Sequence, residues 1–143
     1  MKKELKYKEV MNTKIFFKNC NLSSYTTIKV GGVAEYFAEP RNIEEFSYLI
    51  KWANLNKHRC QIIGAGSNLL INNIFIKGLV ICTKKMKSLK IDPYSGIVEA
   101  EAGVMLPTLS NCLAKNGLQG GEWAVGIPGT LGGAIYMLSL IHI

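Results

Sequence analysis

An α+β fold that begins with a strand–helix–strand unit is predicted by the pattern of apolar residues. Short apolar runs typical of strands alternate with two segments whose apolar residues recur at helical spacing. The chain has 143 residues, 48% of them hydrophobic, and it contains no low-complexity tract. This composition favours one folded domain over a disordered chain.

The first elements can be placed from local signals. Residues 1–20 hold six lysines and two glutamates and are predicted to form a basic, partly ordered extension. Residues 33–38 alternate in polarity as a strand does. Asn42 suits a helix N-cap, and Glu45 three residues later completes a capping box. Apolar residues then recur at helical spacing, and this helix is predicted to end near Asn56.

Two more strands and a second helix follow. Cys60–Ile63 and Gly78–Thr83 are predicted strands on either side of a glycine-rich loop. Strand, helix and strand in succession indicate a βαβ unit. Ile97–Ala102 is a further predicted strand, and Pro107 marks the start of a helix that ends before Gly117. The aromatic residues predicted to anchor the core are Tyr25, Trp52 and Trp123.

The first glycine-rich loop is Gly64–Asn68, after which Leu69–Ile71 is predicted to return to the core. Glycine lacks a Cβ and permits positive φ, so several N–H groups can turn toward one anion. The residues predicted to bind a phosphate-bearing cofactor are Gly64, Ala65, Gly66, Ser67, Asn68 and Leu69, of which Gly64, Gly66, Ser67 and Asn68 would contact its diphosphate. The loop matches neither the dinucleotide fingerprint nor the Walker loop, and an ordinary strand-ending turn is the alternative.

The second glycine-rich loop is Gly126–Gly133. Proline fixes φ, and the glycine after it permits a tight reversal. A glycine pair lets a flat group approach the backbone closely. The residues predicted to line the other side of one phosphate-bearing cofactor are Pro128, Gly129, Thr130, Gly132 and Gly133. A glycine-rich surface loop is the alternative.

Three segments together resemble the UDP-N-acetylenolpyruvoylglucosamine reductases, the MurB family of flavoenzymes. They are Asn21–Gly32, Gly64–Leu70 and Gly117–Met137, in the order and at the approximate spacing of that family. The resemblance covers about residues 20 to 137. It implies the FAD-binding fold of the vanillyl-alcohol oxidase (PCMH) type, in which FAD lies between two α+β subdomains. Here the first subdomain would be the βαβ unit, and the second would be incomplete.

The resemblance also implies an activity for the intact parent enzyme. NADPH would reduce a noncovalently bound FAD, and the reduced flavin would convert UDP-N-acetylenolpyruvoylglucosamine to UDP-N-acetylmuramate for peptidoglycan synthesis. The family's catalytic arginine, serine or cysteine, and glutamate match no residue of this chain. No catalytic residue is therefore assigned, and the chain alone is expected to be inactive.

The match to the family pattern stops after Met137. The expected organisation is a basic extension at 1–20, an incomplete FAD-binding domain at 21–137 and a non-native tail at 138–143. The C-terminal substrate domain would be absent. The alternative is a genuine, diverged short protein.

The net charge of +7 is interpreted as a solvated lysine surface, including Lys84, Lys85, Lys87 and Lys90. These clusters lack interleaved arginines and stacking aromatics, so no nucleic-acid partner is predicted. Such a surface can draw an anionic nucleotide substrate toward the site.

The four cysteines, Cys20, Cys60, Cys82 and Cys112, lack metal-ligand spacing and are predicted to be reduced core thiols without a metal. His58 is predicted to be a surface residue. With no apolar segment long enough to span a bilayer and no signal peptide, a cytoplasmic location without a membrane partner is predicted. Two alternatives stay open, another FAD oxidoreductase of the same fold and a nonenzymatic nucleotide-binding module.

If the fragment interpretation is correct, the gene continues the family pattern beyond Met137 in one of the three reading frames. Resequencing the downstream nucleotides tests this. A native stop codon after Ile143 would exclude a fragment.

Overall fold

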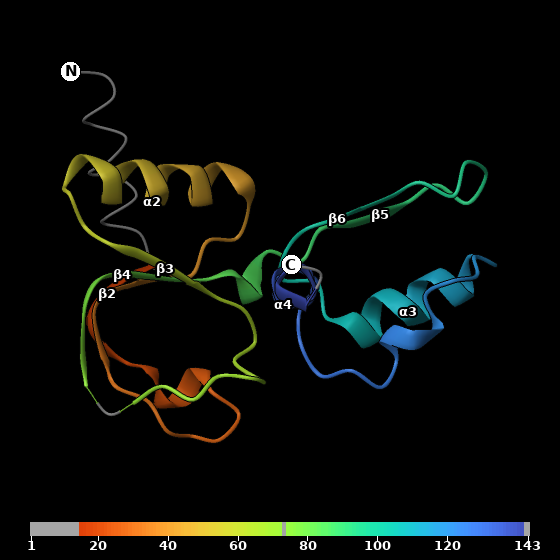
Figure 1. Cartoon of the computed structure of the whole chain (residues 1–143). Coiled ribbons are helices and arrows are strands. Elements are labelled where there is room, and N and C mark those ends of the chain that lie inside the picture. The colour runs from red at the N-terminus through yellow and green to blue at the C-terminus, as the bar shows by residue number, and fades with distance from the viewer. Residues whose placement is uncertain (1–14, 73, 142–143) are drawn as a thin grey trace, which may run out of the picture.

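The computed structural model of the chain describes residues 15–72 and 74–141. Most of the predicted extension at 1–20, and the end of the predicted tail, therefore lie outside the described residues. Figure 1 shows two parts, a sheet covered by a helix and, beside it, a hairpin with further helices. Within the described ranges, no helix has the length and apolar character needed to cross a membrane.

The first part is a four-stranded sheet with the strand order β1-β2-β4-β3. Strands β2, β4 and β3 run parallel, and β1 pairs antiparallel with β2. The strands are β1 Phe16–Asn21, β2 Val33–Ala38, β3 Cys60–Ile63 and β4 Phe75–Cys82. The predicted βαβ unit is confirmed as β2-α2-β3, and β4 is inserted between its two strands.

Helix α2, Ile43–Leu55, lies over one face of the sheet (Figure 1). Its predicted N-cap is confirmed, because Asn42 Oδ1 accepts a hydrogen bond from the Glu45 N–H at 2.9 Å. The second bond of the capping box is displaced by one residue. Glu45 Oε2 accepts from the Arg41 N–H at 2.7 Å instead of from the N-cap residue. The Glu45 side chain therefore binds the N–H of Arg41, the residue before the N-cap, and not the N–H of Asn42.

A buried cluster lies on each face of the sheet. On the face toward α2, Ala38, Leu79 and Ile81 of the sheet pack with Leu49 and Ala53 of the helix. On the opposite face, Leu22, which precedes β2, packs with the strand residues Ala34, Phe37, Ile63, Val80 and Cys82. Adjacent residues of β4 contribute to opposite faces, as the pleat requires. The central strand is therefore apolar on both sides, which explains its continuous run of hydrophobic residues.

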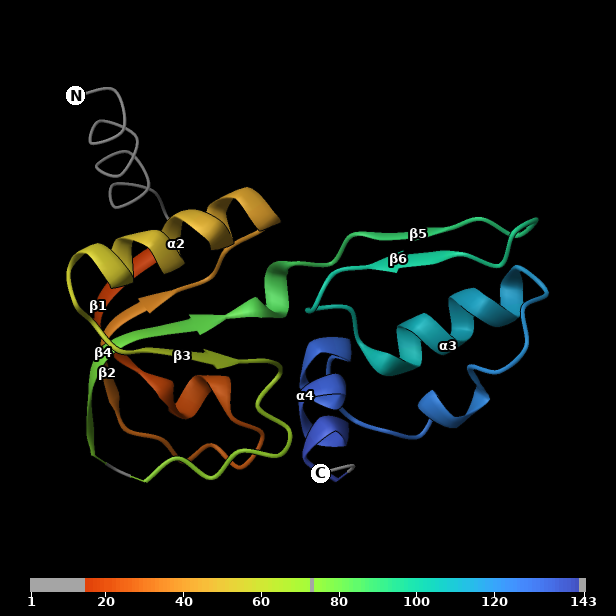
Figure 2. The same cartoon turned by 45° about the horizontal axis from the view of Figure 1, so that its top comes forward.

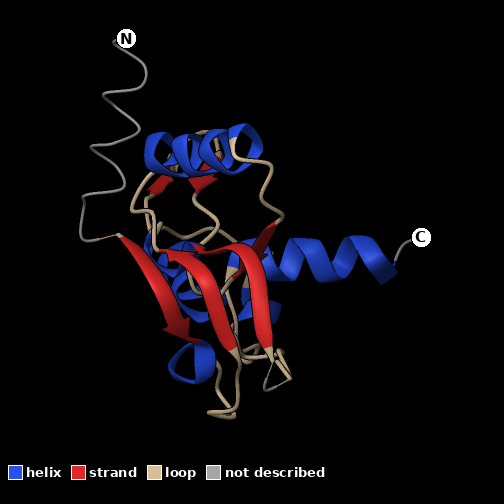
Figure 3. Cartoon of the chain, turned by 90° about the vertical axis from the view of Figure 1, so that its left-hand side faces the viewer, coloured by secondary structure: helices blue, strands red, loops and turns tan. Residues whose placement is uncertain are grey.

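The second part contains a hairpin and two helices. Strands β5 and β6 pair antiparallel, helix α3 begins with a proline in its first turn, and a short helix η3 packs against α3. In Figure 2, α4 lies between the sheet and the rest of this part, and Figure 3 shows it extending away from the sheet. The elements are β5 Leu89–Ile91, β6 Val98–Ala100, α3 Leu106–Lys115, η3 Glu122–Ala124 and α4 Leu131–Ile141.

Several sequence predictions need correction. Phe16–Asn21 is a strand rather than part of an extension; as an edge strand it is largely exposed and shows no alternation in burial. Strand β4 begins at Phe75, three residues before the predicted start, and β6 is shorter than predicted. Strand β5 and helix α4 were not predicted, because β5 has three residues and α4 opens with a glycine pair.

Aromatic residues divide between core and surface. Tyr25 packs on Phe37 with ring centroids 4.3 Å apart, and Trp52 packs on the α2 face of the sheet. The prediction for Trp123 is wrong, because its side chain is 55% exposed. His58, predicted at the surface, is half-buried and stacks on Trp52 at 5.2 Å.

The two phenylalanines paired across β1 and β2 give a test of this packing. Phe37 is fully buried, whereas its cross-strand neighbour Phe17 is 40% exposed. Phe37→Ala is expected to lower the free energy of unfolding by about 3–5 kcal/mol because it leaves a cavity. Phe17→Ala, the matched control, should cost much less. Urea titration measures both, and equal losses would contradict the assigned core.

Candidate functional site

The two glycine-rich loops, sixty residues apart in sequence, lie against each other. The Ser67 hydroxyl donates a hydrogen bond to the Pro128 carbonyl at 3.0 Å. A Cβ added at Gly64 would overlap the Thr130 hydroxyl, and one added at Gly129 would lie 3.3 Å from Ser67 Oγ. The first loop leaves the end of β3 and meets the start of α4 (Figure 2). The structure therefore brings both predicted halves of the site together.

The first loop presents a row of free backbone donors. Among the described residues, no backbone carbonyl accepts a hydrogen bond from the N–H groups of Ala65, Gly66, Ser67 or Asn68. Successive N–H groups in such a turn form a concave donor site for an anion. The Gly66 carbonyl does have a partner, the Thr27 N–H at 3.1 Å. The loop is thus held by the Gly66 carbonyl, whereas its N–H groups have no backbone partner among the described residues.

The structure adds a reason for the glycine at position 66. The sequence predicts glycine here for a positive φ and for the close approach of a ligand. Gly66 has a φ of +70°, which confirms the first of these, and a Cβ there would overlap the Tyr25 carbonyl. Its absent side chain also lets the loop pack against the segment Tyr25–Thr27.

The second loop ends earlier than predicted, because Leu131, Gly132 and Gly133 form the first turn of α4. The Leu131 N–H donates to the Val104 carbonyl at 2.8 Å, and the Gly132 N–H to the Ala102 carbonyl at 3.0 Å. A Cβ at Gly132 would lie 2.7 Å from the Cβ of Ala102. This glycine therefore allows α4 to pack on the neighbouring chain, and its N–H group is already used within the protein.

The remaining donor of that turn is weakly engaged. The Gly133 N–H donates to Thr130 Oγ1 at 3.4 Å, and Thr130 itself is buried. Pro128, Gly129 and Thr130 are the second-loop residues that lie directly against the first loop. Leu69 and Leu70 do not return to the core as predicted. Leu70 is 81% exposed, and the first residue of the run to pack on the core is Ile71.

A cavity of about 270 Å³ lies beside the first loop. It is lined by Ser24, Tyr25, Thr26, Thr27, Lys29, Gly64, Ala65, Cys82 and Lys84. Sequence reasoning missed most of this wall, because it assigned Tyr25 to the core and Lys84 to a solvated surface. The useful signal was present in Asn21–Gly32, a segment quoted for the family resemblance but given no contact residue.

Buried charge lies behind this cavity. The Glu39 carboxylate is 8% exposed and forms an ion pair with Lys85 Nζ at 2.8 Å. Burial and the nearby Glu39 carboxylate raise the pKa of Tyr25 to about 12, so its hydroxyl stays protonated near neutral pH.

The thiols are structural in character. All four cysteines are free; Cys82 is buried and the other three are half-buried. Burial raises the pKa of Cys82, which keeps it a thiol, and its Sγ lies 3.5 Å from the Gly64 carbonyl as a weak donor. Within the described ranges, no group of His, Cys, Asp and Glu residues could hold a metal ion.

This fold and these loops match a known class. The family model described as FAD binding domain matches residues 34–140, and the chain belongs to this family of FAD-binding domains. The predicted fold class is thereby confirmed, as is FAD as the cofactor of the family.

Within this family, the chain is similar in sequence to reductases of one kind. The chain is 72% identical over 122 residues to the UDP-N-acetylenolpyruvoylglucosamine reductase of Prochlorococcus marinus strain MED4, a match that covers 85% of this chain and 41% of that protein. The reductase of Prochlorococcus marinus strain NATL2A is 54% identical over 127 residues, which cover 89% of this chain and 44% of that protein. The chain thus spans less than half the length of these relatives.

Two solved structures show the same fold. MurB from Thermus caldophilus superimposes with a TM-score of 0.63 at 30% identity, over 81% of this chain and 40% of that one. Alkyldihydroxyacetonephosphate synthase superimposes with a TM-score of 0.61 at 19% identity, over 81% of this chain and 27% of the other. At that identity the second likeness shows the shared fold alone.

Alanine substitutions at three glycines distinguish the cost of backbone strain from the cost of steric overlap. Gly66→Ala is expected to combine a left-handed φ with overlap against Tyr25, whereas Gly117 has a similar φ of +69° in open space. Gly117→Ala should cost about 1–2 kcal/mol of unfolding free energy, and Gly66→Ala about 1–3 kcal/mol more.

Gly126→Ala is the control, because Gly126 lies outside the left-handed region and its added Cβ meets nothing within 4 Å. Its cost should stay within about 0.5 kcal/mol. Urea titration gives all three values. If Gly66→Ala and Gly117→Ala cost the same, the contact between the first loop and Tyr25 is wrong.

Proposed function

We propose that this chain is the N-terminal, FAD-binding portion of a UDP-N-acetylenolpyruvoylglucosamine reductase. One observation carries the proposal: in a chain of the FAD-binding domain family, the loop Ala65–Asn68, whose N–H groups have no backbone partner among the described residues, packs against a second glycine-rich loop. The similarity to curated reductases supports the choice of this enzyme within the family. A pair of glycine-rich loops could bind the diphosphate of any dinucleotide, so the reductase activity is tested directly below.

The residues present fit the diphosphate of FAD. The N–H groups of the first loop would donate to the phosphate oxygens, with Gly64 and Leu69 at the two ends of the loop. Pro128, Gly129 and Thr130 would close the other side, and Gly133 would contribute its weakly engaged N–H. Gly132 would act through packing on Ala102. Bound FAD would supply the acceptance and donation of a hydride.

The whole enzyme would oxidise NADPH and reduce UDP-N-acetylenolpyruvoylglucosamine, a UDP-sugar, to UDP-N-acetylmuramate. A cytoplasmic location and a role in peptidoglycan synthesis follow from this reaction. The chain would contribute cofactor binding, and the chemistry would depend on residues outside it. The proposed FAD-binding portion is 21–137, with 138–143 foreign to it. This boundary falls inside α4, whose backbone remains helical to Ile141.

A chimera tests the proposal. The matched residues of this chain would replace their counterparts in the Prochlorococcus marinus MED4 reductase, to which they are 72% identical. The purified chimera is expected to bind FAD noncovalently and to show continued turnover of NADPH when the enolpyruvyl substrate is present.

The unaltered reductase is the positive control, and the 143-residue chain alone is expected to show no turnover. A folded chimera that binds no FAD would contradict the proposed cofactor site. A chimera that binds FAD but oxidises a different substrate would favour another oxidoreductase of the same fold.

A further inference from the structure

The two glycine-rich loops supply no full positive charge to a diphosphate. Neither Gly64–Leu70 nor Gly126–Gly133 contains a lysine or an arginine. Backbone N–H groups carry only partial charges, and at most part of an elementary charge gathers at a helix terminus. Full positive charges from elsewhere in the molecule would strengthen the binding of two negative charges at this position.

Two lysines line the cavity beside the first loop. Lys29 and Lys84 line it together with Gly64 and Ala65, the first residues of that loop. The hydroxyl-bearing residues Ser24 and Thr27 line it as well. The cavity is thus continuous with the row of N–H donors and adds charge to it.

Lys29 is held in an unusual backbone conformation. Its φ is +59°, in the left-handed region that a residue with a long side chain rarely adopts. The turn around it is closed by two hydrogen bonds, from the Lys29 N–H to the Thr26 carbonyl at 3.2 Å and from Thr26 Oγ1 to the Val30 carbonyl at 2.7 Å. Strain of this kind persists where the surrounding structure fixes the residue, often at ligand sites.

The Glu39 carboxylate behind the cavity does not form an ion pair with Lys29 or Lys84. Glu39 is paired with Lys85, the residue after Lys84. Neither Lys29 nor Lys84 forms an ion pair with a carboxylate of another described residue. Both ammonium groups therefore remain available to an anion.

We propose that Lys29 and Lys84 form the cationic wall of the cofactor site and bind the diphosphate of a dinucleotide held on the first loop. This inference rests on the proposed function, since it assigns residues to the same cofactor. It predicts that cofactor affinity depends on these two side chains and on ionic strength, because partly exposed ion pairs are screened by salt.

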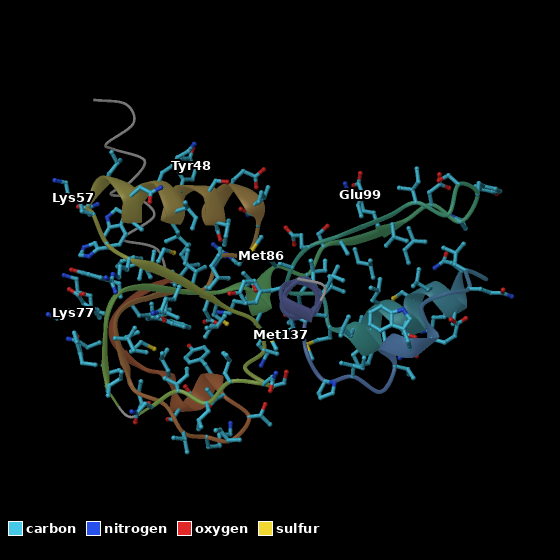
Figure 4. The ribbon with its side chains drawn as sticks, in the orientation of Figure 1. Tyr48, Lys57, Lys77, Met86, Glu99 and Met137 are labelled. Carbon is cyan, nitrogen blue, oxygen red and sulfur yellow. The ribbon has the colours of Figure 1, made fainter. Side chains whose placement is uncertain are left out.

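The test measures the dissociation constant for FAD by quenching of flavin fluorescence in the chimera described above. Lys29→Gln and Lys84→Gln are each expected to raise it about fivefold at low salt. The double variant should also lose most of the salt dependence. Lys77→Gln is the matched control, because Lys77 is an exposed lysine at the opposite end of β4 from Lys84 (Figure 4). It should leave the dissociation constant unchanged.

Thermal melting without FAD accompanies each variant, so that a loss of folding is not read as a loss of binding. If the chimera binds FAD and both lysine variants bind it equally well, this inference is overturned and the proposed function stands. If the chimera binds no FAD, the proposed function fails. A second measurement then decides the inference: titration of the 143-residue chain with inorganic pyrophosphate, followed by NMR. Shifts at the first loop that disappear in the lysine variants support it, and shifts that persist in them, or no shifts, overturn it.

Discussion

The packing of the first glycine-rich loop against Tyr25–Thr27 is the constraint on which the candidate site depends. Gly66 can lie there because it has no side chain, and the Thr27 N–H fixes its carbonyl at 3.1 Å. The N–H groups of Ala65–Asn68 have no backbone partner among the described residues. The same segment leads into Lys29 and one wall of the neighbouring cavity. Donors and cations therefore share one support.

Two further contacts set the position of this loop relative to the second part of the molecule. Ser67 reaches the carbonyl of Pro128, and the absent side chain of Gly64 leaves room for Thr130. Met86 is buried at the junction between the sheet and the hairpin (Figure 4), where its carbonyl accepts from the Gly103 N–H at 2.9 Å. The two loops thus meet closely at Gly64 and Gly129, where an added Cβ would lie against Thr130 and Ser67.

The sequence allowed good prediction wherever a local signal controls the structure. The bounds of β2 and β3 are as predicted, and Asn42 caps α2 because its side chain acts on a neighbour three residues away. Predictions failed where the structure of a segment depends on contacts with residues far away in the sequence. Strand β1 exists because β2 offers it an edge, and Trp123 is exposed because η3 lies at the surface. The residues of the candidate site were found from their glycines, but most of those glycines act on other parts of the chain. Lys29 and Lys84 could not be found in this way, since a lysine beside a cavity and a lysine in solvent look the same in a sequence.

The position of β4 has a consequence for synthesis on the ribosome. Strand β4 lies between β2 and β3 but follows both of them in the chain. Until residues 75–82 have left the exit tunnel, β2 and β3 have no common partner, and α2 lacks Leu79 and Ile81 as part of its packing surface. Strands β1 and β2 can pair earlier, since both precede β4 in the chain. Strand β3 must wait for β4, which completes the core on both faces and joins the strand that leads into the first glycine-rich loop.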